Sequence, residues 1–596
     1  MNSPSIYNFI KDSTFVMFSW MLLSMAFFSY GVFMTKLFGI KISGKRGIFA
    51  KIWLGFTFCI FFFSIYHLLL PINAIASCIF YLPALVYFLL YYLKKLKPLI
   101  KSLGGLKILI ILVTLFSASI IAIQPTTNYD TGLYHLNSIR WANEHHIVKG
   151  LGNLHGRLGF NQLFFLYSAS LNFHPLFNEY AFHVSNSFLY ALFFVGLFIN
   201  GTIIDLLFIC LFFFLPMPYN WINNPTPDIA STFTQIILIR YFLDAVYFKS
   251  DSKDRNSEIT FVAILSALLI TLKLSNVVFV LGLAITTFLF YKNSSKSIDK
   301  AQIYKVTIFI FTFLSIWIIR GYIQTGYPLF PSSIGKIDFK WTVPGKLTKV
   351  HENYVYTCAR CCDETADLNY HLLQNYKWLN RWITQHIFNK KAYISDDLFS
   401  NISIIITLIL FPFTIKNWGI GSLNILIISL LIFFIWLIYS IRHKELLKKN
   451  IVLIELYLVE TASILFWFFT APEPRFANGN FIIIFVISLI LARTFILKKP
   501  VKHWLRLCLC FYPFVMFIWL FIISYSDSEF YINGILPLRK PPMRVFTSNT
   551  GLKVLKPVGQ PYEILDSELP ATPTFYRELS LIGDTLDDGF YMKIDK

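Results

Sequence analysis

Charged residues are scarce in this chain: they make up 14% of its 596 residues, against about 25% in an average soluble domain. Acidic residues are the scarcer kind, with 32 Asp and Glu against 52 Lys and Arg, so the formal net charge is +20. Hydrophobic residues make up 56%, and Phe alone occurs 63 times. This composition excludes a soluble globular enzyme and a disordered chain. We expect a polytopic integral membrane protein.

Nucleotide-binding motifs are absent as well. Neither G-x-x-x-x-G-K-[ST] nor G-x-G-x-x-G stands at a strand-to-helix junction, so ATP-driven transport by this chain alone is disfavoured. The eight Cys do not suggest a disulfide scaffold, because five of them lie in apolar runs. The excess of Lys and Arg is typical of cytoplasmic loops of membrane proteins, and we expect no nucleic-acid partner.

Apolar runs of about 20 residues, the length that crosses a bilayer, predict about 14 transmembrane helices. The runs cover residues 14–40, 52–70, 72–93, 105–123, 180–199, 202–216, 228–248, 259–291, 303–320, 421–440, 451–470, 480–497 and 502–525. The run 259–291 is interrupted at Lys273 and is expected to form two short helices. Residues 401–415 are expected to be re-entrant or interfacial, because a full crossing would put the basic stretch 442–449 outside.

Basic clusters then set the orientation. Residues 41–51 and 94–97 are rich in Lys and Arg, which places these loops in the cytoplasm and both termini outside. We therefore predict an all-α transmembrane domain over residues 1–525, with large external loops at 124–162 and 321–400. An external C-terminal segment follows over residues 526–596.

The first external loop carries Asp130 directly after a span. One interpretation is a helix N-cap; the other is a functional carboxylate at the membrane boundary, acting as a general base or holding a metal. The loop is rich in further polar candidates for substrate binding, namely His135, Arg140, Glu144 and Arg157. We expect the helix after Asp130 to lie along the membrane surface, with Tyr134 and Trp141 as interfacial anchors.

Further candidates for substrate binding lie at the ends of predicted spans. Asp228 is either a helix cap or a site residue, and Lys273 is either a snorkelling lysine or a cation that holds an anionic head group. Arg320 ends a span and leads into a Pro-rich segment that contains Tyr327. Arg475, between two prolines and a span, has the fork geometry that suits a phosphate or carboxylate.

Several segments together carry a resemblance to known membrane proteins. They are YDTGLYH at 129–135, LHGRLGFN at 154–161, PTPD at 225–228, GYPLFP at 326–331, APEPRF at 471–476, LPATP at 569–573 and DGF at 588–590. With an Asp in a large external loop after a span, the chain resembles the GT-C glycosyltransferase superfamily. It looks most similar to uncharacterised bacterial multi-span proteins of cell-surface polysaccharide loci.

The resemblance implies a GT-C-like bundle in the bacterial inner membrane with an active site that faces the periplasm. It implies transfer of a sugar from a polyprenyl-phosphate-linked donor to a glycan, lipid or protein acceptor. Asp130 would be the general base or a ligand of a divalent cation, Mg²⁺ or Mn²⁺. Two alternatives are an O-antigen or capsular polysaccharide polymerase, and a lipid-linked-glycan transporter or flippase, for which internal repeats would be expected.

Overall fold

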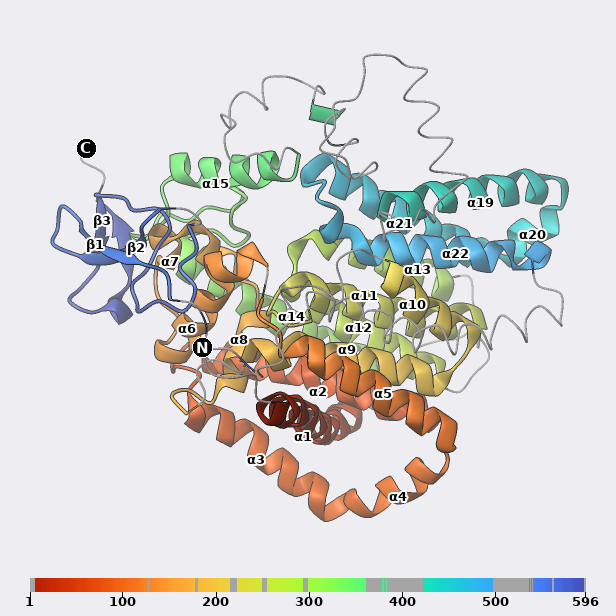
Figure 1. Cartoon of the computed structure of the whole chain (residues 1–596). Helices are drawn as coiled ribbons and strands as arrows, with labels where there is room; N and C mark the ends of the chain where they lie inside the picture. The colour runs from red at the N-terminus through yellow and green to blue at the C-terminus, as the bar shows by residue number, and fades with distance from the viewer. Residues whose placement is uncertain are drawn as a thin grey trace.

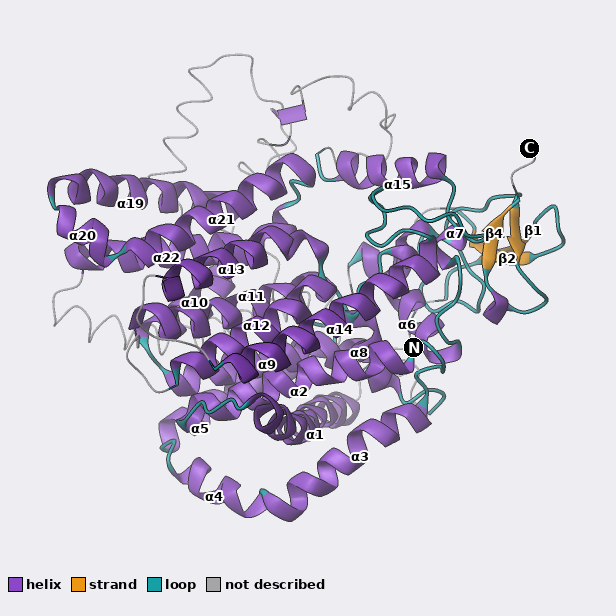
Figure 2. Ribbon diagram, turned by 180° about the vertical axis from the view of Figure 1, so that it is seen from behind, coloured by secondary structure: helices purple, strands orange, loops and turns teal. Residues whose placement is uncertain are grey.

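A computed structural model gives the arrangement of most of the chain. It describes residues 6–126, 128–176, 181–214, 222–248, 254–292, 299–360, 378–379, 382, 422–496, 535, 538, 540–559 and 562–593. Within these residues the regular secondary structure is helical apart from four short strands near the C-terminal end, and loops connect these elements (Figures 1 and 2).

Twelve helices or helix pairs of the described residues are long and apolar enough to cross a membrane. They are built from α1 (Ile6–Phe38), α2 (Gly44–Tyr66), α3 (Ala74–Tyr91), α5 (Gly105–Ala122), α9 (Ala181–Asn200), α11 (Pro227–Leu243) with η4 (Asp244–Phe248), α12 (Arg255–Leu272), η5 (Leu274–Asn276) with α13 (Val277–Lys292), α14 (Lys300–Thr325), α19 (Ser422–Arg442), α21 (Ile451–Thr470), and η7 (Pro474–Ala477) with α22 (Asn478–Ile496). The protein is therefore a multi-pass helical membrane protein.

Most predicted spans coincide with these helices. The break predicted at Lys273 is present, because α12 ends at Leu272 and Lys273 has an extended backbone. The described residues of the run 202–216 form α10 (Ile203–Phe214), an apolar helix of 12 residues. The predicted span at 502–525 and the predicted re-entrant segment at 401–415 lie outside the described residues.

The helices form one bundle that is held together largely by apolar packing. Bulky aromatic side chains such as Phe27, Phe56 and Phe188 are fully buried in it. Small residues allow α1 and α2 to approach closely, since a Cβ on Gly31 would lie 1.8 Å from the Lys51 carbonyl oxygen. Close backbone approach at glycine is typical of helix pairs in membranes.

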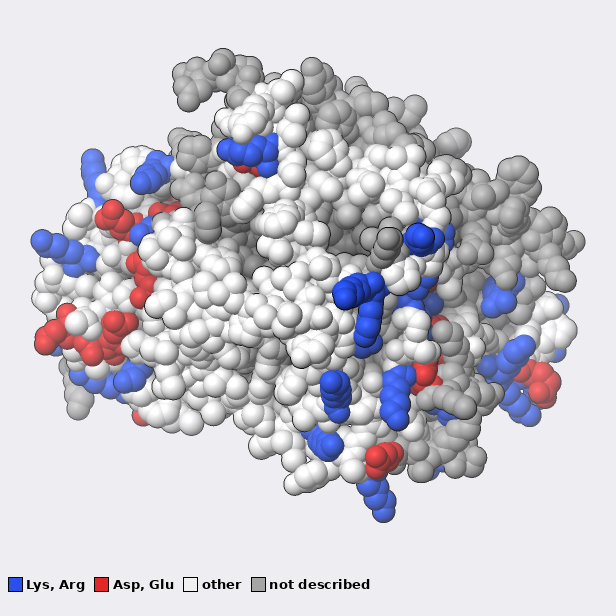
Figure 3. All heavy atoms as spheres, turned by 90° about the horizontal axis from the view of Figure 1, so that it is seen from below, with Lys and Arg blue, Asp and Glu red and all other residues white. Residues whose placement is uncertain are grey.

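The loops of the bundle gather at its two ends. One end, which we call the loop-rich end, carries α6 (Leu136–Glu144), α7 (Leu151–Leu154), η2 (Gly156–Gly159), α8 (Phe164–Asn172) and α15 (Gly345–Cys358). The opposite end carries α4 (Leu93–Lys101) and α20 (Lys444–Lys449) (Figure 1). On the face in Figure 3, charged side chains concentrate towards these ends and leave a broad uncharged belt between them, which is the pattern expected around a bilayer.

This division agrees with the predicted grouping of loops. The described parts of the predicted external loops meet at the loop-rich end, whereas α4 and α20, which belong to predicted cytoplasmic loops, lie at the opposite end. Which end faces the periplasm stays a prediction. The bundle is also closed by ion pairs at the opposite end, where Arg46 contacts both Asp244 and Glu258.

The C-terminal segment packs on the first loop through two small antiparallel sheets. The first sheet consists of β1 (Met543–Thr547) and β2 (Lys553–Pro557), and the second of β3 (Leu579–Leu581) and β4 (Phe590–Met592). A short helix, η8 (Leu586–Asp588), lies between β3 and β4 along the chain. Phe590 is fully buried against Trp141, and its backbone N–H donates to the carbonyl of Lys149 at 2.8 Å. The segment therefore covers the loop rather than extending away from it.

One prediction about the first loop is wrong, because the C-terminal segment covers that loop. Tyr134 and Trp141 were expected to anchor a surface helix in the membrane interface, but they are 7% and 3% exposed. Their rings are packed inside the protein, Trp141 against the C-terminal segment and Tyr134 near Phe160 and Phe165. The first loop is thus an internal layer of the loop-rich end.

Candidate functional site

Asp130 lies between two arginines that come from distant parts of the chain. Its Oδ1 accepts a hydrogen bond from Arg157 Nη1 at 2.5 Å, and its Oδ2 accepts one from Arg475 Nη2 at 2.8 Å. Asp130 makes no helix-capping hydrogen bond through its side chain. Each carboxylate oxygen is instead engaged by a guanidinium, which is the geometry of a charge-assisted pair.

A second carboxylate extends this cluster. Asp228 Oδ2 lies 3.8 Å from Arg475 Nε, and Asp228 Oδ1 accepts a hydrogen bond from Lys273 Nζ. Asp228 is not the cap of its helix, because Thr226 supplies the capping oxygen. The side chains of Asp130, Arg157, Asp228, Lys273 and Arg475 therefore form one chain of alternating charge, which we call the charged cluster.

Local backbone features bring the cluster members to one place. Thr226 and Pro227 start α11 and put Asp228 in its first turn, which also suits the helix dipole. Lys273 has an extended backbone and lies between α12 and η5, at the break between two helical segments. Pro474 starts the turn that presents Arg475. Polar residues at helix ends and breaks thus meet where the membrane helices enter the loop-rich end.

Aromatic rings surround the cations. The guanidinium of Arg157 lies between Tyr134 and Tyr354, at 5.4 Å and 5.3 Å from their ring centroids. Lys273 Nζ lies 3.4 Å from the ring centroid of Phe476. These distances are typical of cation–π interactions. The aromatic rings therefore hold the cations in place without neutralising their charge.

The charged cluster lines a cavity of about 330 Å³, which is the size of a small-molecule site. The lining also includes apolar side chains, namely Leu272 of α12, Leu274 of η5, Trp317 of α14, and Leu329 and Phe330 of the loop that follows α14. The cavity therefore offers both charged and apolar groups where the membrane helices end.

The charges in the cavity shift the pKa of its members. Burial alone would raise the pKa of Asp130, but Arg475 and Arg157 together hold it well below its usual range. Burial lowers the pKa of Lys273, and Asp228 offsets part of that effect. Burial raises the pKa of Glu473, with Arg475 opposing it. Asp130 is consequently a stable anion whose negative charge is shared between two cations.

His135 is the sixth predicted residue that lines this cavity. Its ring is 1% exposed, and its Nδ1 lies 3.1 Å from Thr131 Oγ1. Burial lowers the pKa of His135 to about 4, although Asp130 opposes that effect. His135 is therefore neutral at physiological pH.

Four other predicted residues lie elsewhere. Arg140 and Glu144 pair with each other at 2.6 Å and face a different cavity beneath the C-terminal segment. Arg320 is buried, and it donates to the Ser64 carbonyl and contacts His67 Nδ1. Tyr327 is 1% exposed and donates to the Val343 carbonyl behind the cavity wall.

Glu473 and Tyr354 are among the cavity residues that were not singled out from the sequence. Glu473 lies 4.0 Å from Arg475 Nε; its place in the APEPRF segment is the signal that could have found it. Tyr354 comes from α15 in the second large loop. Nothing in the local sequence of α15 indicates its contact with Arg157.

The cluster does not fit a resident divalent cation. Among the described residues, no group of three or more His, Cys, Asp and Glu side chains is placed to hold a metal ion. Both oxygens of Asp130 already accept hydrogen bonds from arginines. Asp130 therefore lacks the companion ligands that Mg²⁺ or Mn²⁺ needs.

Fold and cavity together define a multi-pass helical membrane protein with a charged, half-apolar cavity at one membrane boundary. Residues 14–420 match a family described as a domain of unknown function, DUF8201. This is more than half of the chain, so the protein belongs to that family. No curated protein and no solved structure matches the chain.

Proposed function

We propose that the protein is a membrane glycosyltransferase that takes a sugar from a polyprenyl-phosphate-linked donor and transfers it to an acceptor hydroxyl in the cavity of the charged cluster. The observation that carries this proposal is the pairing of Asp130 with Arg157 and Arg475 inside a cavity that also has apolar lining residues. The resemblance to the GT-C superfamily supports the reaction type by analogy only.

The apolar and the charged residues of the cavity suit the two parts of such a donor. A prenyl chain can pack along Leu272, Leu274 and Trp317, where burial of its apolar surface is favourable. A phosphate has the acceptor oxygens that guanidinium and ammonium groups bind. Arg157, Arg475 and Lys273 offer three such groups in one cavity.

The proposed reaction needs a base and a stabilised leaving group. The acceptor hydroxyl oxygen forms a bond to the anomeric carbon of the donor sugar, and the bond between that carbon and the phosphate oxygen breaks. The hydroxyl proton passes to Asp130. The polyprenyl phosphate leaves with its electron pair, and the cations stabilise the negative charge that develops on it.

In the proposed reaction, Asp130, whose pKa is low, becomes a better base after the donor has bound. A carboxylate held by two guanidiniums is a weak base. A donor phosphate competes for the same N–H groups, and each guanidinium that turns to phosphate releases part of its hold on Asp130. The pKa of the carboxylate then rises, so Asp130 becomes a better base only when the donor is present.

The experiment is donor consumption in membranes that contain matched amounts of wild type, Asp130→Asn or Arg475→Ala. Asn keeps the size of Asp130 but cannot accept the proton. We expect both variants to lose turnover of a polyprenyl-phosphate sugar by at least about a hundredfold, the lower range for loss of a general base and for loss of one group that stabilises a developing negative charge. Lys336→Ala, at an exposed ion pair in the second large loop, is the control.

Two outcomes would contradict the proposal. Full turnover in Asp130→Asn would show that this carboxylate is not the base. A wild-type protein that consumes no lipid-linked sugar, but moves it across the bilayer, would be a carrier instead.

A further inference from the structure

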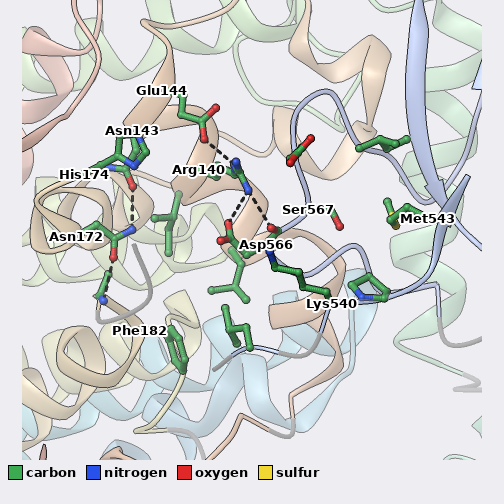
Figure 4. A pocket seen from close by; sticks show the side chains of 17 residues that line it. Arg140, Asn143, Glu144, Asn172, His174, Phe182, Lys540, Met543, Asp566 and Ser567 are labelled. Carbon is green, nitrogen blue, oxygen red and sulfur yellow. Dashed lines mark hydrogen bonds and ion pairs between the residues drawn. The ribbon is translucent and has the colours of Figure 1, made fainter. Parts of the chain in front are cut away.

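A second and larger cavity, of about 420 Å³, lies between the first loop and the C-terminal segment. Figure 4 shows its interior, where Arg140 lies between Glu144 of the first loop and Asp566 of the C-terminal segment. Its rim carries Lys540 and Glu568, which are exposed. The cavity is therefore reachable from the surface, and its volume is that of a small-molecule site.

Helix α6 separates this cavity from that of the charged cluster. Asp130, Tyr134 and His135 line the cavity of the charged cluster, whereas Leu136, Ile139 and Arg140 line the second cavity. The two cavities thus share one short stretch of chain, with Asp130 at its start.

The charges of the second cavity do not favour an anion. Two basic and three acidic side chains line it, which leaves one negative charge in excess. Arg140 is already bonded to Glu144 Oε1 at 2.6 Å and to the Asp566 carbonyl at 2.9 Å. A phosphate or another acidic ligand would meet carboxylates here, so a neutral ligand fits better.

The lining combines flat polar groups with an apolar surface. Carboxylates and a guanidinium provide hydrogen-bonding groups in fixed orientations, because Arg140 is bonded to Glu144 and to Asp566. The amides of Asn143 and Asn172 line the cavity as well, but they are bonded to each other and to backbone groups. Phe182 and Ile139 provide an apolar surface beside them. A sugar ring has the matching properties, with hydroxyls around its edge and C–H groups on its faces, and hydrogen bonds to charged groups are the stronger kind.

We propose that the second cavity binds a sugar unit of the acceptor glycan, remote from the hydroxyl that reacts. This inference rests on the proposed function, which places the reacting hydroxyl next to Asp130. Binding energy from a remote part of a substrate can orient the reacting part. The cavity would thereby select glycans that carry a suitable sugar at that distance.

The C-terminal segment connects this cavity to the reaction site. The backbone N–H groups of Ile564 and Leu565 both donate to the Gly132 carbonyl, at 3.0 Å and 2.7 Å. Gly132 is two residues from Asp130, and Asp566 is the next residue of the segment. A sugar that contacts Asp566 and Arg140 therefore stabilises the turn that holds Asp130.

The test measures binding of the purified full-length protein to a printed array of bacterial surface oligosaccharides. Met543→Trp fills the cavity from β1, where Met543 lines it. Val545→Trp is the matched control, because it lies two residues along the same strand, is 60% exposed and is not among the cavity-lining residues. Melting temperatures check that both variants fold.

We expect wild type and Val545→Trp to bind the same oligosaccharides, and Met543→Trp to bind them at least about tenfold more weakly. Absence of wild-type binding to any oligosaccharide, or equal binding by Met543→Trp and Val545→Trp, would overturn this inference. Binding of an oligosaccharide needs neither the donor nor the transfer reaction. Oligosaccharide binding by a protein that consumes no donor would therefore leave the second cavity in place and refute the transferase proposal alone.

Discussion

The pairing of Asp130 with Arg475 should be measurable as a coupling free energy between two residues that are 345 positions apart. The perturbation is a double-mutant cycle with Asp130→Asn, Arg475→Gln and the double variant. Two unit charges about 4 Å apart interact by about 4 kcal/mol at an effective dielectric constant of about 20. Because the side chains of Arg475 and Asp130 are 23% and 13% exposed, solvent screens part of this interaction, and we expect about 2 kcal/mol.

The exposed pair of Lys349 and Glu352 is the internal control. Its N···O distance is 2.9 Å, close to the 2.8 Å of Asp130 and Arg475, but its side chains are 63% and 39% exposed, against 13% and 23%. We expect a coupling of about 0.5 kcal/mol or less for this pair. The assay is equilibrium unfolding in mixed micelles of a mild detergent and sodium dodecyl sulfate. A coupling below about 0.5 kcal/mol for Asp130 and Arg475 would refute the reasoning.

Three further predictions concern stability. Burial holds the pKa of His135 at about 4, so below about pH 6.5 the unfolded chain binds a proton on this residue that the folded protein does not bind. The free energy of unfolding should therefore fall by roughly 3 kcal/mol between pH 6.5 and 4. His135→Gln should lose this part of the pH dependence, and a variant whose stability falls with pH as steeply as that of wild type would contradict the prediction. Gly150→Ala should cost about 2 kcal/mol or more, because Gly150 has φ +62 and a Cβ there would lie 2.1 Å from the Phe590 carbonyl oxygen; faster proteolysis of the C-terminal segment would report its release, and unchanged proteolysis would argue against the contact. Gly31→Ala should cost about 1–3 kcal/mol by forcing α1 away from Lys51 on α2, and an unchanged melting temperature would show that the two helices are not so close.

The membrane helices could be predicted from the sequence because a bilayer imposes one requirement, a long apolar run, that is visible locally. The break at Lys273 was visible for the same reason, since a cation in an apolar run rarely continues a membrane helix. The loops were predicted less well. Trp141 looked like an interfacial anchor because its neighbours along the chain did not reveal that Phe590 would cover it.

The site was predictable as a set of residue types but not as a geometry. Polar residues at the ends of apolar runs pointed to Asp130, Asp228 and Arg475. Their pairing depends on how distant helices pack, which no local pattern encodes. Arg140 is only ten positions from Asp130, yet its position on α6 makes its side chain line the second cavity instead of the cavity of the charged cluster.

The most direct test of the central claim is the affinity for a polyprenyl phosphate, measured by native mass spectrometry of detergent-solubilised protein. If phosphate and Asp130 compete for the same guanidiniums, Asp130→Asn should bind the lipid phosphate at least as tightly as wild type while it loses turnover. Arg475→Ala should bind about tenfold more weakly, since loss of one charge-assisted hydrogen bond is worth about 1.5 kcal/mol or more. Weaker binding by Asp130→Asn, together with unchanged binding by Arg475→Ala, would contradict the account.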